Sequence, residues 1–230
     1  MDPVVIIGFW SAAFLVSHFI LSSEPIRPKL IAAVGEWPFR GIYSAVALGT
    51  FIPLVVEFAR HKHAGAMLWY LRDIPPLRSL VWFMMLAALI LFTAGLITPS
   101  PAGMAGATAE LVPRGELKLT RHPGFVAFTL FGLAHMIMNG WAGDLLFFAT
   151  FPILGILGGF HQDARKAQMI GEPYRRFVAA TSFFPGAALL SGRQRWTSAD
   201  TPWRAIAIGA AVTIVLVALH PMLFGGHPLG

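Results

Sequence analysis

The residues of this chain best able to do chemistry are histidines that lie inside apolar stretches. Of its eight histidines, His18 lies in LVSHFILSS and His135 in GLAHMIMNG. A polar side chain at membrane depth is costly, so its presence there suggests a function. Two neutral imidazoles on two helices suit the iron of a haem. They suit zinc less well, because a closed zinc site takes four ligands.

Plainer roles could also account for these histidines. A buried His135 could donate a hydrogen bond to a backbone carbonyl of a neighbouring helix. His122 directly precedes a proline and could simply begin a helix at the membrane surface. His61 and His63, in the sequence RHKH, could form a solvated basic cluster. The sequence leaves these alternatives open.

Other kinds of active site have little support. The chain has no cysteine, which excludes disulfides, thiolate nucleophiles and cysteine-bound zinc or iron–sulfur centres. No glycine-rich phosphate loop is present, because GGF at 158–160 is not followed by Gly-Lys-Ser. Glu57 is the only acid well within a predicted span, and it could pair with Arg60 or relay protons.

The elements that position these histidines are predicted to be membrane-spanning helices. The chain is 56% hydrophobic and only 12% charged, whereas a soluble domain carries about 25% charged residues. A membrane-spanning helix needs about 20 mostly apolar residues. We expect six spans, at about 3–21, 39–58, 80–97, 123–138, 145–160 and 203–220. The predicted fold is an all-α, polytopic membrane helical bundle formed by one domain, residues 1–230, with a tight turn at 139–144.

The distribution of basic residues predicts an orientation. Most lysines and arginines fall in the loops of one side, which the positive-inside rule places in the cytoplasm. Both termini should then be periplasmic, in the inner membrane of a bacterium. The lipid bilayer explains the net charge of +6 without a nucleic acid partner. The segment 161–202 contains HQDARKAQMIGEPYRRF, which predicts an interfacial amphipathic helix, either solvated or in contact with lipid headgroups.

Several motifs together resemble the NnrU family, which includes the zeta-carotene cis–trans isomerases of plants and cyanobacteria. They are VSHFILSSEPIRPKLIAAVGEWPFRGIYS, HKHAGAMLWYL, KLTRHPGFVAFTLFGLAHMIMNG, GGFHQDARK, GEPYRRFVAATSFFPGAALLSGRQ and ALHPML. The resemblance covers nearly the whole chain. The combination of HxxLSS, RHP and AHxxxNG is specific to the family, whereas RHP alone is not.

The resemblance implies a cofactor and a reaction. The related isomerase holds haem b between two histidines, which match His18 and His135, and isomerises a central cis double bond with reduced iron. His61, His122 and His220 also match histidines of the isomerase, as reserve ligands or neighbours of the ligands. Bacterial members are linked genetically to denitrification, in particular to nitrite and nitric oxide reductase activity.

Two features of this chain depart from a simple transfer of the isomerase site. The isomerase has a cysteine three residues before its second histidine, where this chain has Gly132, so ligand exchange between thiolate and imidazole is impossible here. At about 1.5 Å per residue, His18 lies roughly 5 Å and His135 roughly 18 Å from the inner membrane boundary. The two ligands of one iron must converge, so this difference in depth is an objection to the pair.

Four functional hypotheses follow. The first is a haem b protein of NnrU type, associated with denitrification, that binds nitric oxide, transfers electrons or senses redox state; Arg121 would pair with a haem propionate. The second is a haem-dependent cis–trans isomerase of a carotenoid or other polyene lipid. The third is an S-adenosylmethionine-dependent methyltransferase, because RHP with GEPYRRF also resembles isoprenylcysteine-type methyltransferases; its cofactor would meet His122, Glu172, Tyr174 and Arg175. The fourth is an assembly factor that docks a respiratory complex.

Overall fold

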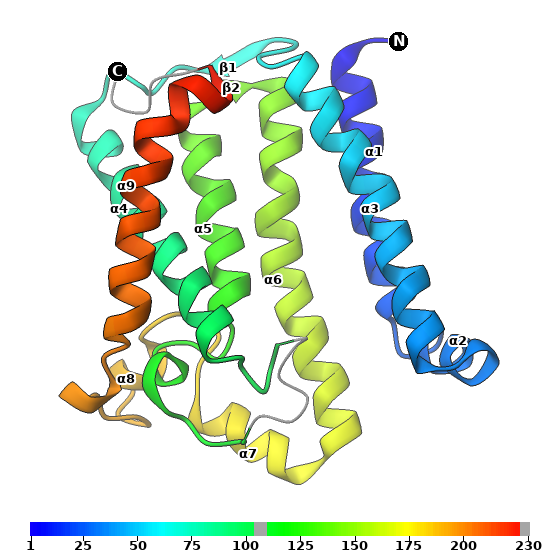
Figure 1. Ribbon diagram of the computed structural model, residues 1–230, viewed down its shortest axis with the longest axis vertical. Coiled ribbons are helices and arrows are strands. Elements are labelled where there is room, and N and C mark those ends of the chain that lie inside the picture. Colours follow the sequence, from blue (N-terminus) through cyan, green and yellow to red (C-terminus); the bar gives the residue numbers. More distant parts are fainter. Residues whose placement is uncertain (104–109, 226–230) are drawn as a thin grey trace. The chain divides into compact units, whose positions relative to one another are not determined.

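A computed structural model describes residues 1–103 and 110–225 as an assembly of helices with one small strand pair (Figure 1). The α-helices are α1 Pro3–Ser22, α2 Arg27–Val34, α3 Glu36–Arg60, α4 Pro75–Ile97, α5 Pro123–Met138, α6 Ala142–Ile170, α7 Glu172–Ala180, α8 Ala187–Leu190 and α9 Trp203–Phe224. Two 3₁₀ turns, η1 Gly115–Lys118 and η2 Ser198–Asp200, and the strands β1 Met67–Trp69 and β2 Gly140–Trp141 complete the described elements. The predicted all-α class is confirmed.

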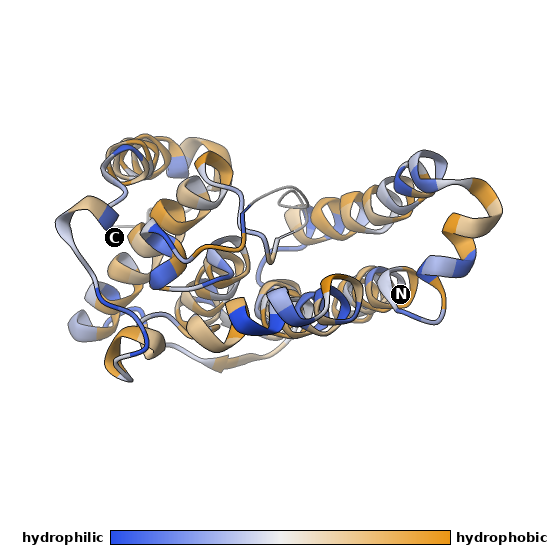
Figure 2. Cartoon of the chain, turned by 90° about the horizontal axis from the view of Figure 1, so that it is seen from below, coloured by the Kyte–Doolittle hydropathy of each residue, from blue (hydrophilic) through white to orange (hydrophobic). Residues whose placement is uncertain are grey.

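The long helices have the length and composition of membrane spans. Among the described residues, α1, α3, α4, α6 and α9 are long and apolar enough to cross a bilayer, and α5 is apolar but shorter, with 16 residues. Orange, the colour of hydrophobic residues, dominates these helices in Figure 2. The protein is therefore a helical membrane protein, and five of the six predicted spans meet the length expected of one.

Helix α6 is longer than the sequence predicted. It has 29 residues and ends at Ile170, about ten residues beyond the expected end of the fifth span. Gly171, with φ of 77°, then turns the chain and precedes the first residue of α7. Tyr174 and Phe177 of α7 are buried while Arg175 and Arg176 are exposed. The predicted amphipathic helix is thus the nine-residue α7, and the first part of its expected segment belongs to α6.

The predicted tight turn at 139–144 contains a strand that the sequence did not reveal. Strand β2 pairs antiparallel with β1, with Trp69 opposite Gly140. A Cβ atom on Gly140 would collide with the Trp69 backbone, which explains the glycine. The neighbouring Arg72 donates to the Met138 carbonyl at 3.0 Å and to the Asn139 side chain at 2.6 Å. These bonds satisfy acceptors at the end of α5.

The chain forms two compact units. Unit 1 comprises Met1–Arg78 and Gly132–Leu154, and unit 2 comprises Ser79–Phe131 and Gly155–Gly230. Helices α5 and α6 contribute residues to both. Ile7 and Leu54 are fully buried in unit 1, and Tyr174 is fully buried in unit 2. Each unit contains one of the two groups of candidate site residues.

Candidate functional site

Six phenylalanines of unit 1 form a connected group, which we call the aromatic array: Phe14, Phe51, Phe58, Phe147, Phe148 and Phe151. They come from α1, α3 and α6. The ring centroids of Phe14 and Phe51 lie 5.1 Å apart, and those of Phe51 and Phe151 lie 6.2 Å apart. The rings of Phe58 and Phe147 stack in parallel at 3.9 Å. Phe147 and Phe151 share a face of α6 because they are four residues apart.

The two histidines of the predicted haem site contact opposite ends of this array. The His18 ring lies 5.3 Å from Phe14 and 4.9 Å from Tyr43. The His135 ring stacks on Phe148 with centroids 4.6 Å apart and an angle of 23° between the planes. Both imidazoles are half-buried. The structure therefore places His18 and His135 in the same unit, connected through phenylalanine rings.

The packing of α1 on α6 allows an estimate of how far His18 and His135 are offset along the helix axes. Ser11 donates to the Leu146 carbonyl at 3.2 Å, which puts these two residues at one level. His18 lies seven residues beyond Ser11, roughly 10 Å along α1, and Phe148, which stacks on His135, lies roughly 3 Å beyond Leu146. The offset is therefore about 7 Å, smaller than the depth estimate from the sequence implied.

The residue types at the array fit a haem better than a zinc ion. Among residues 1–103 and 110–225, no group of three or more histidine or acidic side chains could hold a metal ion. Imidazole is a common protein ligand of haem iron, whereas structural zinc takes four protein ligands. Phenylalanine rings also suit the faces of a flat apolar macrocycle. His18 and His135 would hold the group.

The other two predicted reserve ligands lie elsewhere. His61 follows the end of α3, and its Nδ1 atom lies 3.1 Å from the Glu57 carbonyl and 3.4 Å from the Glu57 carboxylate. His220 belongs to the C-terminal part of α9 in unit 2, where its ring lies 5.0 Å from Phe224. Their assignment as ligands stays a prediction.

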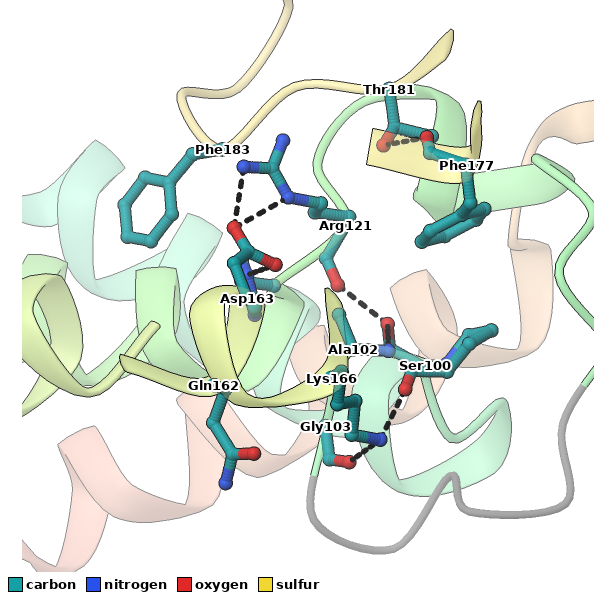
Figure 3. Close-up of polar contacts among 12 residues, drawn as sticks. Ser100, Ala102, Gly103, Arg121, Gln162, Asp163, Lys166, Phe177, Thr181 and Phe183 are labelled. Atoms are coloured by element: carbon teal, nitrogen blue, oxygen red, sulfur yellow. Dashed lines mark hydrogen bonds and ion pairs between the residues drawn. The ribbon is translucent and has the colours of Figure 1, made fainter. Parts of the chain in front are cut away.

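In unit 2, the Asp163 carboxylate of α6 contacts the predicted site residues Arg121 and His122 and also Tyr174. Its Oδ2 atom accepts from Arg121 Nε at 2.9 Å and from Arg121 Nη2 at 2.6 Å (Figure 3). Its Oδ1 atom lies 2.9 Å from His122 Nε2 and accepts from the Tyr174 hydroxyl at 2.7 Å. We call these four residues the Asp163 cluster. It joins the segment before α5 to α6 and α7.

The Asp163 cluster is buried. The side chains of Arg121, His122 and Asp163 are only 9%, 0% and 13% exposed. Burial of such charges is tolerated because each is paired and hydrogen-bonded. Because Arg121 makes two hydrogen bonds to Asp163, its predicted contact with a haem propionate would compete with that carboxylate. That contact stays a prediction.

A second set of bonds joins the segment after α4 to the same helices. Lys166, one turn after Asp163, donates to the carbonyls of Pro101 and Gly103, the latter at 2.7 Å. The Ser100 hydroxyl donates to the Arg121 carbonyl at 2.5 Å (Figure 3). These hydrogen bonds hold the segment after α4 against the start of α5 and the C-terminal part of α6.

The protonation of His122 gives the Asp163 cluster a pH dependence. Burial lowers the pKa of His122, although the adjacent Asp163 opposes this shift. Below about pH 6.5, His122 therefore binds a proton in the unfolded chain but stays neutral in the folded chain. The free energy of unfolding should then fall as the pH drops below about 6.5. Thermal unfolding in detergent should show a smaller acid loss for His122→Gln, whose amide can still donate to Asp163. Parallel pH curves for the two proteins would refute this role of His122.

Gly132 of α5 has no room for a side chain. A Cβ atom there would collide with Pro152 and would lie 2.6 Å from the Phe148 carbonyl. Gly132→Cys should therefore destabilise the protein by about 1–3 kcal/mol, the usual cost of overpacking. Gly49→Ala is the matched control, because nothing lies within 4 Å of its Cβ position. Equal unfolding temperatures for Gly132→Cys and wild type would show that α5 and α6 are not in close contact here.

Sequence reasoning did not single out Asp163, Lys166 or the aromatic array. Asp163 is an acid among basic residues in HQDARK, and only the fold brings it to His122, 41 residues earlier. The array has a visible signal, because FFATF places Phe147 and Phe151 four residues apart. The four residues predicted to cradle a methyl donor are divided: His122 and Tyr174 bind Asp163, whereas Glu172 and Arg175 pair with each other at the exposed surface.

Comparison with known proteins identifies the family. The sequence profile described as "NnrU protein" matches residues 6–228. The chain belongs to the NnrU family. This NnrU-family chain is 27% identical over 225 residues to "15-cis-zeta-carotene isomerase, chloroplastic" of Arabidopsis thaliana, a match that covers 92% of the chain and 58% of that protein. The protein of the same name from Zea mays is 27% identical over 193 residues, 79% of the chain and 50% of the relative.

The NnrU-family chain thus spans about half the length of the curated relatives it matches, 58% of one and 50% of the other. No solved structure gives a significant match to it.

Proposed function

We propose that this NnrU-family protein is a membrane-embedded cis–trans isomerase of a conjugated polyene of the carotenoid type. The observation that carries the proposal is the similarity to 15-cis-zeta-carotene isomerase over 92% of the chain. Among the described residues, the aromatic array supports it. A polyene is long, flat and apolar, and stacked or edge-on phenylalanine rings stabilise such a surface beyond the effect of burial alone.

The array is suited to hold a polyene but not to protonate it. Its six members are all phenylalanines, and Phe14, Phe147 and Phe148 are each only 7% exposed. Isomerisation of a double bond needs no gain or loss of atoms, so it requires no proton donor at the reacting carbons. The array would exclude water and orient the chain, and the adjacent His18 and His135 would supply ligands.

The proposed cofactor is haem b, held by His18 and His135. When bound and reduced, it would supply an electron-rich iron centre whose interaction with the π electrons of a polyene lowers the double-bond character of one bond. The residues of the array would keep the substrate within the apolar interior and limit its rotation to one bond. Gly132 leaves no thiolate beside His135, so the imidazoles alone would serve as protein ligands.

A test of the isomerase proposal uses cells that accumulate the 15-cis isomer of zeta-carotene. The chain is expressed in them in the dark, because light isomerises carotenoids, and the isomers are separated by chromatography with absorbance detection. We expect the 15-cis peak to decrease in favour of an isomer with a trans central bond. Cells expressing His135→Ala at equal level should retain the 15-cis isomer. Unchanged isomer ratios with the wild-type protein would refute the proposal.

The alternative functions stay predictions. An association with denitrification would appear as a growth defect of a deletion strain on nitrite in the absence of oxygen. A methyltransferase would be stabilised against heat by S-adenosylmethionine. The predicted inner-membrane location, with periplasmic termini, is tested by reporter fusions at both ends.

A further inference from the structure

Unit 2 contains a cavity where α4 ends and α9 begins. Its volume is about 350 Å³. Its wall combines apolar side chains of the two helices with polar residues of η1 and η2: Ala94, Ile97, Thr98, Gly115, Glu116, Ala199, Asp200, Thr201, Pro202, Trp203, Arg204 and Ala205. This volume is near the lower end of the range for small-molecule sites, so it suits a compact group.

Glu116 provides a buried acceptor in this wall. It is only 4% exposed, and its Oε1 atom has no hydrogen-bond partner among residues 1–103 and 110–225. Burial raises the pKa of Glu116, partly offset by hydrogen bonds from its backbone and from Thr98. A buried carboxyl oxygen without a partner is costly. A ligand that donates a hydrogen bond or carries a positive charge would remove that cost.

Two other charged residues line the cavity, Asp200 and Arg204, and only Asp200 is hydrogen-bonded to described residues. Asp200 accepts from Lys118 Nζ at 2.8 Å and from the Thr197 hydroxyl at 2.7 Å. Arg204 is exposed and makes no hydrogen bond or ion pair with any other residue in the described part of the chain. Among residues 1–103 and 110–225, the wall therefore offers Glu116 as an unsatisfied acceptor and Arg204 as an unpaired cation.

The position of the cavity at the ends of two apolar helices suits a lipid headgroup. Helices α4 and α9 are adjacent (Figure 1), and they are in close contact where a Cβ atom on Gly209 would lie 2.7 Å from Ile90 Cα. The cavity is at the ends of both apolar helices, beside Trp203, which is 69% exposed. Exposed tryptophans are enriched at membrane–water interfaces. Farther along the same two helices, a second apolar groove is lined by Trp82, Phe83, Leu86, Ala210, Thr213 and Ile214.

We propose that this cavity binds the headgroup of a phospholipid that carries a primary ammonium next to its phosphate, as in phosphatidylethanolamine. The ammonium would donate to Glu116 and the phosphate would contact Arg204. The apolar side chains of Ala94 and Ile97 would meet the start of the acyl chains. A choline headgroup lacks N–H donors, so it leaves Glu116 Oε1 unsatisfied. The site should therefore distinguish these two zwitterionic lipids, although their net charges are equal.

Native mass spectrometry of the purified full chain tests the site. The protein is equilibrated with vesicles that contain equal amounts of phosphatidylethanolamine and phosphatidylcholine, and the retained lipids are counted. We expect roughly tenfold preference for phosphatidylethanolamine, the factor that one hydrogen bond to a charged group provides. Glu116→Gln should reduce this preference to near unity. Arg204→Gln should reduce retention of both lipids and leave the preference intact.

Matched controls separate the site from general lipid binding and from misfolding. Glu110→Gln changes an exposed glutamate of the same segment and should retain the preference of the wild type. If Glu116→Gln unfolds, Arg204→Gln still tests the proposal, because Arg204 is exposed and its replacement should reduce the retention of both lipids equally. Equal retention of both lipids by the wild type would overturn it. Displacement of the lipid by an equal concentration of soluble phosphoethanolamine would overturn the assignment to a membrane lipid. This outcome does not depend on whether the isomerase proposal is correct.

Discussion

Replacing Asp163 by alanine should destabilise the protein by about 3–5 kcal/mol, the cost of removing one partner from a buried ion pair. Arg121 would retain a charge in a site where its side chain is only 9% exposed. His122 and Tyr174 would lose the same acceptor. The effect should therefore exceed that of Tyr174→Phe, which removes a single donor and leaves the ion pair, at roughly 1.5–3 kcal/mol.

Unfolding in mixed detergent micelles, followed by circular dichroism, measures this effect. Asp73→Ala is the matched control, because Asp73 is exposed and its contact with the Tyr70 hydroxyl is long, at 3.5 Å. Its substitution should change stability by less than about 0.5 kcal/mol. Equal unfolding curves for Asp163→Ala and Asp73→Ala would show that the Asp163 cluster contributes nothing to the fold.

His18→Ala and His135→Ala should each reduce haem binding drastically. Each substitution removes a proposed iron ligand, so the loss should exceed the roughly 10–100-fold fall in metal affinity that follows loss of an outer-shell partner. The measurement is the absorbance spectrum of protein purified from haem-replete cells, oxidised and reduced. Both variants should lose the wild-type spectrum, and added imidazole should partly restore it because it can occupy the vacated ligand position.

His227→Ala controls for general effects of histidine loss, because His227 lies in the C-terminal tail outside the described residues. It should bind haem as the wild type does. If His18→Ala and His135→Ala both retain the wild-type spectrum, these two residues are not the ligands. Spectra of His61→Ala and His220→Ala then identify which of the reserve histidines replaces them.

The sequence predicted the helices well because lipid imposes a simple rule on them. The expected spans 3–21 and 123–138 differ from α1 and α5 by at most one residue at either end. The ends of apolar runs and the residues that cap helices define such ends. At the start of α1, for example, the Asp2 side chain accepts from the Val4 amide. The end of α6 was missed because polar residues continue the helix where their partners satisfy them: Lys166 is buried, and the Asp163 side chain is only 13% exposed.

The sequence predicted the members of the sites better than their assembly. His18 and His135 stood out as polar residues in apolar spans, but the phenylalanines that connect them come from three helices. Arg121 and His122 were predicted as site residues, yet their partner Asp163 is distant in sequence and has no motif of its own. The pairing of β1 with β2 was missed because strands of three and two residues are too short for a periodic pattern.

The most direct test of the central claim is conversion of 15-cis-zeta-carotene by the purified protein. The haem-loaded protein, in liposomes, is reduced under anaerobic conditions in the dark, and the isomers are followed over time by chromatography. We predict time-dependent loss of the 15-cis isomer with the wild type and none with His135→Ala. If the reduced wild-type protein, with its haem spectrum intact, leaves the isomer ratio unchanged, the proposed isomerase function is wrong.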